Sequence, residues 1–196
     1  YQVVIVPIWK SEEEKSEINE FVAKLTNGLK AEQIRFYYDN REQETPGWKF
    51  NYYEMKGVPI RLEVGPKDVA KNQVVLVRRD PTDIESIGPK QHIPVDNTPT
   101  VIKNLLEEIQ TNLFKRAQAF RENNTFQAEN YDQFKELIEA GGFIRVFWAG
   151  NSADEARIQE ETKATIRVIP FEQKEKGTCF YTGKTTDRIV IFARAY

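Results

Sequence analysis

The 196-residue chain is poor in cysteine, histidine and methionine, with one of each, and its net charge is only −2. A single cysteine and the absence of a secretory signal favour a reducing compartment. A nearly neutral chain has no global basic field, so any contact with RNA or DNA must come from a local patch. No apolar run approaches the roughly 18 residues that a membrane span requires.

The residue patterns that carry catalysis are also missing. There is no Ser/His/Asp arrangement, no glycine-rich phosphate loop and no HExxH motif. His92 has no acidic or cysteine partner close in sequence, which favours a surface or loop position, and Cys179 alone cannot hold a structural metal. The chain begins without Met and enters an apolar segment almost at once, so we expect a fragment of a longer protein.

The first hundred residues alternate between strand and helix patterns. Ser11 to Glu14 has the spacing of a capping box, and Gly57 is suited to end a helix that Thr45 and Pro46 begin. We expect strands at 3–6, 34–39, 58–64 and 74–77, helices at 12–30 and 46–56, and irregular structure over 81–97. Strands that alternate with helices favour an α/β sheet with helical cover.

The rest of the chain begins with a long helix. Thr98 and Pro99 open this helix, which is expected to reach about residue 119 or beyond and to bridge two domains. In the last third, strand and helix patterns alternate again. Its expected elements are a helix from 131 that ends at Gly141, strands at 143–148, 166–169 and 188–193, a helix at 154–162 and a hairpin at 177–184.

Residues 47–68 set acids and bases close together. Arg61 and Glu63 lie two residues apart on a half-buried strand and therefore share its polar face. Glu54 falls in the last turn of a helix, where the dipole disfavours an anion by about 0.3–1 kcal/mol. One acid and one base together can read the donor and acceptor edge of guanine. The alternative is a solvated face with ordinary salt bridges, each worth less than about 1 kcal/mol.

The aromatic residues favour core positions. Trp48, Tyr52 and Met55 share one helical face and are expected to pack on the sheet. Trp9 and Trp148, like Trp48, are interpreted as core residues rather than base-stacking platforms. The run from Arg78 to Asp80 is either an ion pair at a strand end or a phosphate contact.

Several long motifs in a fixed order carry a family resemblance: "PGWKFNYYEMKGVPIRLEVGPKD", "VVLVRRD", "EETKATIRVIPF" and a terminal "FARAY". With them the chain resembles, over essentially its whole length, the C-terminal half of prolyl-tRNA synthetases of the archaeal/eukaryotic-like form. The resemblance implies an α/β fold. A mixed-sheet class II anticodon-binding domain would occupy 1–100, a linking helix 101–128, and a small α+β C-terminal domain 129–196.

The resemblance also implies a function. Members of the family activate proline with ATP and Mg²⁺ and esterify it to tRNA(Pro), whose anticodons end in two guanines. The residues that match the family's anticodon readers are Glu54, Arg61, Lys67, Asp68 and Arg79. The class II catalytic motifs cannot be found here, so this chain contains no catalytic residue and is not expected to make prolyl-adenylate alone.

The expected partners are tRNA(Pro) and the family's own catalytic domain, through which the full-length enzyme would form a homodimer in the cytoplasm. No membrane or DNA partner is expected. In the family the carboxylate of a final tyrosine, here Tyr196, reaches toward the catalytic domain. Two alternatives remain: a free-standing accessory RNA-binding protein related to anticodon-binding domains, and an unrelated small-molecule-binding α/β protein.

The sequence departs from the family at a metal site. Many relatives carry four cysteines with zinc spacing, and the matching positions here are Ala149, Ala153, Cys179 and Thr182. Three of the four ligands are replaced, so apolar packing and the hydrogen bonds of the hairpin are expected to hold this region.

We therefore predict that the purified chain holds no stoichiometric zinc, because one thiolate cannot supply the four ligands of a structural site. Elemental analysis of the purified protein checks this. About one equivalent of zinc per chain would contradict the prediction.

Overall fold

The structure is a computed structural model that describes residues 1–80, 89–171, 173 and 175–194. Two compact units make up the chain, Tyr1–Phe114 and Lys115–Tyr196. Helix α4 (Thr98–Asn123) is the long helix expected from the sequence, and the division between the units falls within it. The domain limits at residues 100 and 128 remain predictions. Part of the segment expected to be irregular (81–88) and Tyr196 lie outside the described residues.

The first unit contains a five-stranded sheet in the order β2–β1–β3–β4–β5. Strands β2, β1 and β3 are parallel, and β4 and β5 continue the sheet in antiparallel pairing. The mixed sheet matches the expected fold class. Its strands are β1 (Val3–Pro7), β2 (Phe36–Tyr38), β3 (Ile60–Val64), β4 (Gln73–Arg78) and β5 (Gln91–Pro94).

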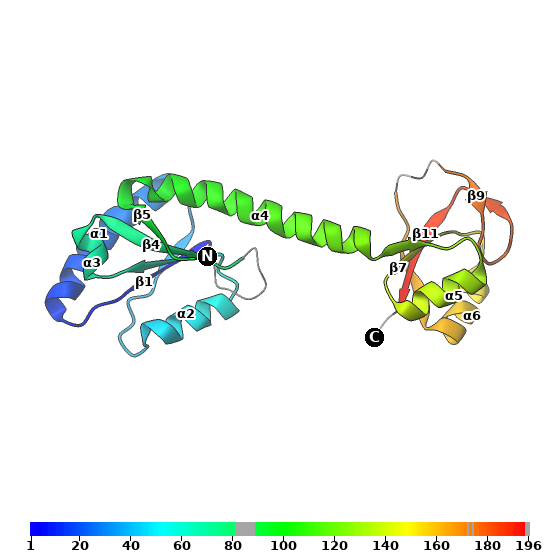
Figure 1. The fold of residues 1–196 in the computed structure, drawn as a ribbon, viewed down its shortest axis with the longest axis horizontal. Helices are drawn as coiled ribbons and strands as arrows, with labels where there is room; N and C mark the ends of the chain where they lie inside the picture. Colours follow the sequence, from blue (N-terminus) through cyan, green and yellow to red (C-terminus); the bar gives the residue numbers. More distant parts are fainter. Residues whose placement is uncertain (81–88, 172, 174, 195–196) are drawn as a thin grey trace. The chain divides into compact units, whose positions relative to one another are not determined.

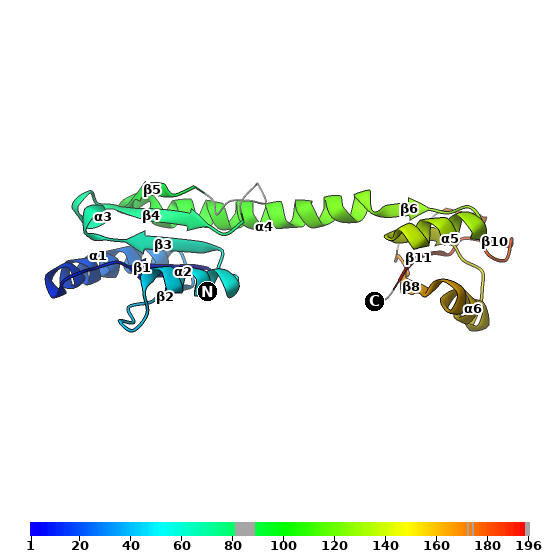
Figure 2. The same cartoon turned by 60° about the horizontal axis from the view of Figure 1, so that its bottom comes forward.

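Helices cover both faces of this sheet (Figures 1 and 2). Helices α1 (Glu12–Ala31) and α4 pack on one face, where apolar side chains of β1, β3 and β4 form the larger core. Helix α2 (Pro46–Met55) lies on the opposite face, and its Tyr53 packs against Val4 and Val6 of β1. The short helix α3 (Pro66–Ala70) joins β3 to β4.

The helix ends are built as the sequence predicts. The Ser11 hydroxyl accepts a hydrogen bond from the amide of Glu14 at 3.3 Å, and the Thr45 hydroxyl accepts one from the amide of Trp48 at 3.3 Å. Each contact satisfies an amide that the first helical turn leaves without an intrahelical partner. Gly57 has a φ of 77°, the left-handed conformation that glycine adopts most readily after a helix end.

The expectation of irregular structure at 81–97 is wrong for its last part. Residues Gln91–Pro94 form strand β5, and Val95–Asn97 form a short 3₁₀ helix, η1. Strand β5 is held by antiparallel pairing to β4, in which His92 faces Val75. Two of its four residues are polar and the last is proline, so the segment lacks a local strand pattern, and the long-range pairing alone creates it.

The second unit contains a four-stranded sheet in the order β6–β7–β11–β8 and a separate β9–β10 hairpin. Helices α5 (Tyr131–Ala140) and α6 (Ser152–Thr162) contribute Phe134, Ile138 and Ile158 to a core that they share with β7 and β11. The expected hairpin is confirmed. The strands are β6 (Thr125–Gln127), β7 (Phe143–Phe147), β8 (Ala164–Val168), β9 (Gly177–Thr178), β10 (Thr185–Thr186) and β11 (Ile189–Arg194).

The core of the first unit makes one clear stability prediction. Leu62 is fully buried on β3 between β1 and β4. We expect Leu62→Ala to lower the free energy of unfolding by about 2–5 kcal/mol, because it removes buried apolar surface and leaves a cavity. Leu113→Ala is the matched control, since Leu113 is 47% exposed on α4 and its truncation should cost less than about 1 kcal/mol. Urea unfolding measures both values. If Leu62→Ala and Leu113→Ala lower the free energy of unfolding equally, the burial of Leu62 is contradicted.

Candidate functional site

A strip of polar side chains crosses β3, β4 and β5 on the sheet face that carries α2. Val4 of β1 is in register with Arg61, Glu63 with Val75, and Val75 with His92, so these residues point to the same face. Helix α2 packs over β1 on this face, and the polar residues lie beyond it toward β5. We call this set the polar strip: Arg61, Glu63, Gln73, Lys90 and His92.

Glu63 is the centre of the strip. Its carboxylate is only 5% exposed and accepts hydrogen bonds from Arg61 Nε at 3.1 Å, Arg61 Nη2 at 3.0 Å and Lys90 Nζ at 2.6 Å. The guanidinium of Arg61 also lies over the ring of Phe50 from α2, 4.1 Å from its centroid. Arg61 is therefore fixed by an ion pair and a ring, and the expectation that Arg61 and Glu63 share a polar face is confirmed.

Asp68 lies at the β5 end of the same face. Its Oδ2 accepts the amide of Gly65 at 3.0 Å, which caps α3, and its Oδ1 accepts Gln73 Nε2 at 3.4 Å. His92 Nδ1 is 2.9 Å from Gln73 Nε2 and 3.9 Å from Asp68 Oδ1. The expected surface position of His92 is confirmed. Sequence reasoning missed its acidic neighbour, because that neighbour is 24 positions earlier in the chain.

Glu54 and Arg79 meet at the C-terminal end of α2. Arg79 Nε donates to the backbone oxygen of Glu54 at 2.8 Å, and the Arg79 amide donates to Pro59 O at 2.9 Å. A cation at this end of the helix offsets its dipole. The Glu54 carboxylate has no hydrogen bond or ion pair within the described part of the chain.

The neighbouring arginine, Arg78, has a different role. Its Nε and Nη2 atoms bind Asp80 at 2.9 and 3.0 Å, and Nη1 binds Glu108 of α4 at 2.8 Å. The strand-end ion pair is thus present at Arg78. Of the five candidate readers, Glu54 and Arg79 are in direct contact, Arg61 and Asp68 lie on one sheet face, and Lys67 is exposed on α3.

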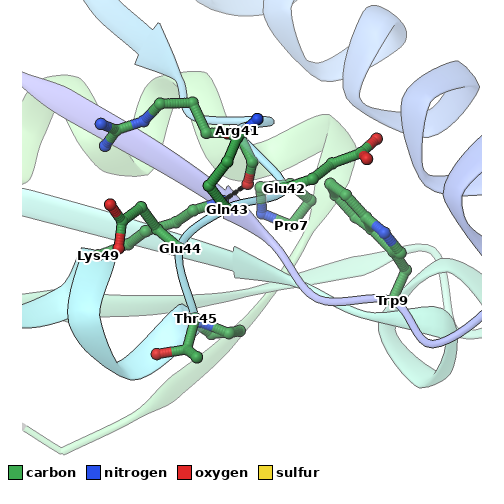
Figure 3. Close-up of a pocket in the computed structure, with 9 residues that line it drawn as sticks. Pro7, Trp9, Arg41, Glu42, Gln43, Glu44, Thr45 and Lys49 are labelled. Carbon is green, nitrogen blue, oxygen red and sulfur yellow. Dashed lines mark hydrogen bonds between the residues drawn. The ribbon is translucent and has the colours of Figure 1, made fainter.

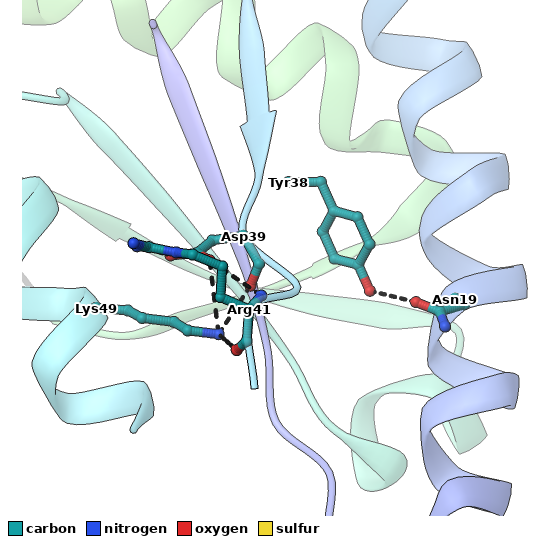
Figure 4. Close-up of polar contacts among 5 residues, drawn as sticks. All are labelled: Asn19, Tyr38, Asp39, Arg41 and Lys49. Carbon is teal, nitrogen blue, oxygen red and sulfur yellow. Dashed lines mark hydrogen bonds and ion pairs between the residues drawn. The ribbon is translucent and has the colours of Figure 1, made fainter. Parts of the chain in front are cut away.

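A buried charge cluster lies at the carboxyl end of β2, where sequence reasoning did not predict one. Asp39 is fully buried, and its carboxylate accepts Arg41 Nε at 2.9 Å and Nη2 at 2.7 Å (Figure 4). Lys49, from α2, is 2% exposed and donates to the backbone oxygens of Asp39 at 3.0 Å and Arg41 at 2.6 Å. These bonds tie the start of α2 to the loop after β2.

Burial acts to raise the pKa of the Asp39 carboxyl, but the hydrogen bonds from Arg41 and the charge of Lys49 outweigh it. The net pKa of Asp39 therefore lies below its usual value. Burial lowers the pKa of the Lys49 amine, and the charge of Asp39 opposes that shift. One carboxylate faces two cations, so the cluster carries one net positive charge.

A cleft of about 260 Å³ opens beside this cluster (Figure 3). Pro7 and Trp9 line it from the end of β1, Arg41 from the loop after β2, and Lys49 from α2. It lies at the carboxyl ends of parallel strands where the sheet order reverses around β1, a common place for ligands in open α/β sheets. Glu42 and Glu44 also line it, so its charge is mixed.

The expected orientation of α2 is wrong. Lys49 and Tyr53 are its buried residues, whereas Trp48 is 41% and Met55 89% exposed. The helix is turned because Lys49 reaches the buried carbonyls of the β2 loop and Tyr53 fills the space above β1. Trp48 is therefore not a core residue. Trp148 is buried as expected, and Trp9 is partly buried against the larger core.

The positions that match the family's zinc ligands do not fit a metal. Ala149 and Ala153 offer no donor atom, and the Sγ of buried Cys179 accepts the amide of Thr182 at 3.4 Å. Aromatic rings fill the space around this thiol, including Phe180 and Trp148 with ring centroids 5.9 Å apart. Among the residues that the structure describes, no group of three His, Cys, Asp or Glu side chains could hold a metal. The absence of zinc remains a prediction.

None of the helices in the described ranges is both long enough and apolar enough to cross a membrane.

Comparison with known families gives the class of the protein. Residues 2–105 match the family model of the anticodon binding domain, and residues 131–196 match that of the C-terminal domain of prolyl-tRNA synthetase. The first match contains β1 to β5 together with every residue of the polar strip. The five-stranded sheet and the polar strip thus lie in an anticodon-binding domain.

Relatives with known names agree with this assignment. A proline–tRNA ligase of Chloroflexus aggregans is 53% identical over 196 residues, and one of Porphyromonas gingivalis is 43% identical over 197. The matches cover 100% of this chain but 40% and 39% of those proteins, so the chain spans about two fifths of their length. The structure of prolyl-tRNA synthetase from Cryptosporidium parvum, complexed with L-proline and AMP, matches with 29% identity and a TM-score of 0.84. That match covers 100% of this chain and 41% of the solved one. The chain belongs to the anticodon-binding-domain family, and it is similar to the C-terminal part of prolyl-tRNA synthetases.

The buried carboxylate of Asp39 predicts a pH dependence. Its pKa is lower in the folded chain than in the unfolded chain, where an aspartate has a pKa of about 3.9. Its contribution to stability is therefore complete above that pH and is lost as the pH falls through the folded pKa. We expect Asp39→Asn to lower the free energy of unfolding at pH 7 by about 1.5–3 kcal/mol and to weaken its fall below pH ~4. Urea unfolding across pH measures both.

Glu20→Gln, at an exposed position in the middle of α1, is the control and should change neither quantity appreciably. If the free energy of unfolding of Asp39→Asn falls at acid pH as steeply as that of the unmodified chain, the Asp39 carboxyl does not titrate at a shifted pKa.

Proposed function

We propose that this chain recognises the anticodon of tRNA(Pro) as part of a proline–tRNA ligase. The observation that carries the proposal is the polar strip, in which the carboxylate of Glu63 orients an arginine inside a domain that matches the anticodon-binding family. A purely basic surface would bind any RNA backbone, whereas paired acids and bases discriminate between nucleobases.

The arginine is held in place through only part of its guanidinium. Arg61 uses Nε and Nη2 to bind Glu63, and within the described part of the chain no hydrogen bond engages Nη1, whose N–H groups can donate to the O6 or N7 acceptor of a guanine. The ion pair with Glu63 and the contact with Phe50 fix the guanidinium before RNA arrives. Such preorganisation reduces the conformational entropy that is lost when RNA binds.

The carboxylates supply the complementary half of the recognition. Guanine presents N–H donors on its Watson–Crick edge, and the Glu54 carboxylate in the last turn of α2 is suited to accept from them. Asp68 also retains acceptor capacity, because each of its oxygens accepts one hydrogen bond and has a second lone pair. Lys67 and Arg79 add cations for O6 or for phosphate.

In the full-length ligase, ATP and Mg²⁺ would serve proline activation in a catalytic domain, which also provides the homodimer contact. The protein would act in the cytoplasm. The relatives that match this chain are proline–tRNA ligases, and the chain spans about two fifths of their length. This match supports its assignment to one part of such a ligase.

The readers are tested by binding to the isolated anticodon stem-loop of tRNA(Pro). Glu54→Ala and Arg61→Ala are each expected to weaken binding by about 1–3 kcal/mol, the value of one base contact. Glu13→Ala and Arg35→Ala change the same residue types at exposed positions outside the strip and should bind like the unmodified chain. Fluorescence anisotropy or calorimetry measures the Kd.

A stem-loop with both guanines replaced by adenines extends the test. The unmodified chain should bind it more weakly, and Arg61→Ala should reduce the preference. If both variants bind the tRNA(Pro) stem-loop as tightly as the unmodified chain, the assigned readers are wrong.

A further inference from the structure

A second hollow lies on the other side of α2, at the edge of the sheet formed by β2. Its volume is about 350 Å³, within the range of small-molecule sites. The groups around it are four phenol rings and two cations, together with Val58, and the lining contains no carboxylate. The polar lining residues are Tyr1, Tyr37, Arg41, Tyr52, Tyr53 and Lys56.

The rings form a continuous chain that extends beyond the hollow. Tyr1 and Tyr37 have ring centroids 5.2 Å apart, Tyr37 and Tyr53 6.0 Å, and Tyr52 and Tyr53 5.1 Å. Trp48 then stacks on Tyr52 at 4.8 Å with an interplanar angle of 15°. Tyr53 is buried and Tyr37 and Tyr52 are partly exposed, whereas Tyr1 and Trp48 are exposed, so this chain of rings presents aromatic surface on which a planar ligand can stack.

The cations are placed against these rings. Arg41 lies 5.6 Å from the centroid of Tyr52, and Lys56 Nζ lies 5.1 Å from the same ring. Arg41 is held in an ion pair by the buried carboxylate of Asp39, and exposed Lys56 adds a second cation. Two cations therefore border the hollow, whose lining contains no carboxylate.

Two cations and several stacking faces without a carboxylate favour a ligand that is planar, aromatic and anionic. Nucleotides in single-stranded RNA have this chemistry, and sites that bind them without sequence preference combine aromatic faces with basic side chains. We propose that this tyrosine hollow binds one unpaired nucleotide of a bound RNA, with its base on Tyr52 and its phosphate near Lys56 and Arg41.

The proposal rests on the proposed function, which makes RNA the partner. Lys56 follows Glu54 by two residues, so the hollow and the candidate readers lie on two sides of the same helix end. A strand that presents guanines to the polar strip can place a neighbouring nucleotide across the end of α2. The hollow would add affinity that does not depend on the sequence of that nucleotide.

The test uses the whole 196-residue chain and two RNA stem-loops, one with the proline anticodon and one with its two guanines replaced by adenines. Tyr52→Ala is expected to raise the Kd about tenfold for both RNAs, because stacking is tolerant of base identity. Lys56→Gln should lower the slope of log Kd against log salt by about 0.7, the value of one single-strand phosphate contact.

The matched controls are Lys24→Gln, at an exposed position on α1, and Phe120→Ala, on α4 with Phe120 63% exposed. Neither should change binding. If Tyr52→Ala and Lys56→Gln bind both RNAs like the unmodified chain while Arg61→Ala does not, the hollow is not an RNA site, although anticodon recognition stands. If the unmodified chain binds both stem-loops equally and the Tyr52 and Lys56 variants still weaken binding, the hollow stands and the proposed base reading fails.

Discussion

The position of helix α2 depends on a buried carboxylate. Asp39 ends β2 inside the protein, and its charge is stable there only because Arg41 and Lys49 surround it. Lys49 belongs to α2, so its hydrogen bonds to the β2 loop fix the rotation of the helix about its own axis. That rotation places Tyr53 over β1, Phe50 against Arg61, and Trp48 and Tyr52 on the outer surface.

The same rotation gives α2 two distinct sides. On one side Phe50 supports the guanidinium of Arg61, which Glu63 also holds, so that the arginine presents a defined edge. On the other side the rings of Tyr52 and Trp48 lie beside Arg41 and Lys56. Recognition of a base by hydrogen bonds and sequence-independent stacking would therefore be organised by a single ten-residue helix.

In the second unit, aromatic side chains pack around Cys179 and Ala149, two of the positions expected to match the family's zinc ligands. The fully buried rings of Phe134 and Phe192 have centroids 5.3 Å apart in an edge arrangement, and Phe180 lies 4.8 Å from Phe134. Gly177 lies against Phe147 so closely that an added Cβ would be 2.3 Å from the ring. Dense aromatic packing of this kind stabilises the hairpin that begins at Gly177.

The sequence by itself determined the helices and most strands, because their apolar periods, caps and turn residues are local signals that survive without tertiary contacts. Ser11, Thr45 and Gly57 mark helix ends correctly, and Arg61 and Glu63 share a face because strand geometry alone requires it. Only the tertiary structure decided which side of α2 is buried, since that choice depends on a lysine reaching carbonyls at the end of another element. It also decided that a polar segment ending in Pro94 becomes the edge strand β5 and that His92 lies beside Asp68. Contacts between residues far apart in the chain leave no local pattern, so the folded chain alone reveals them.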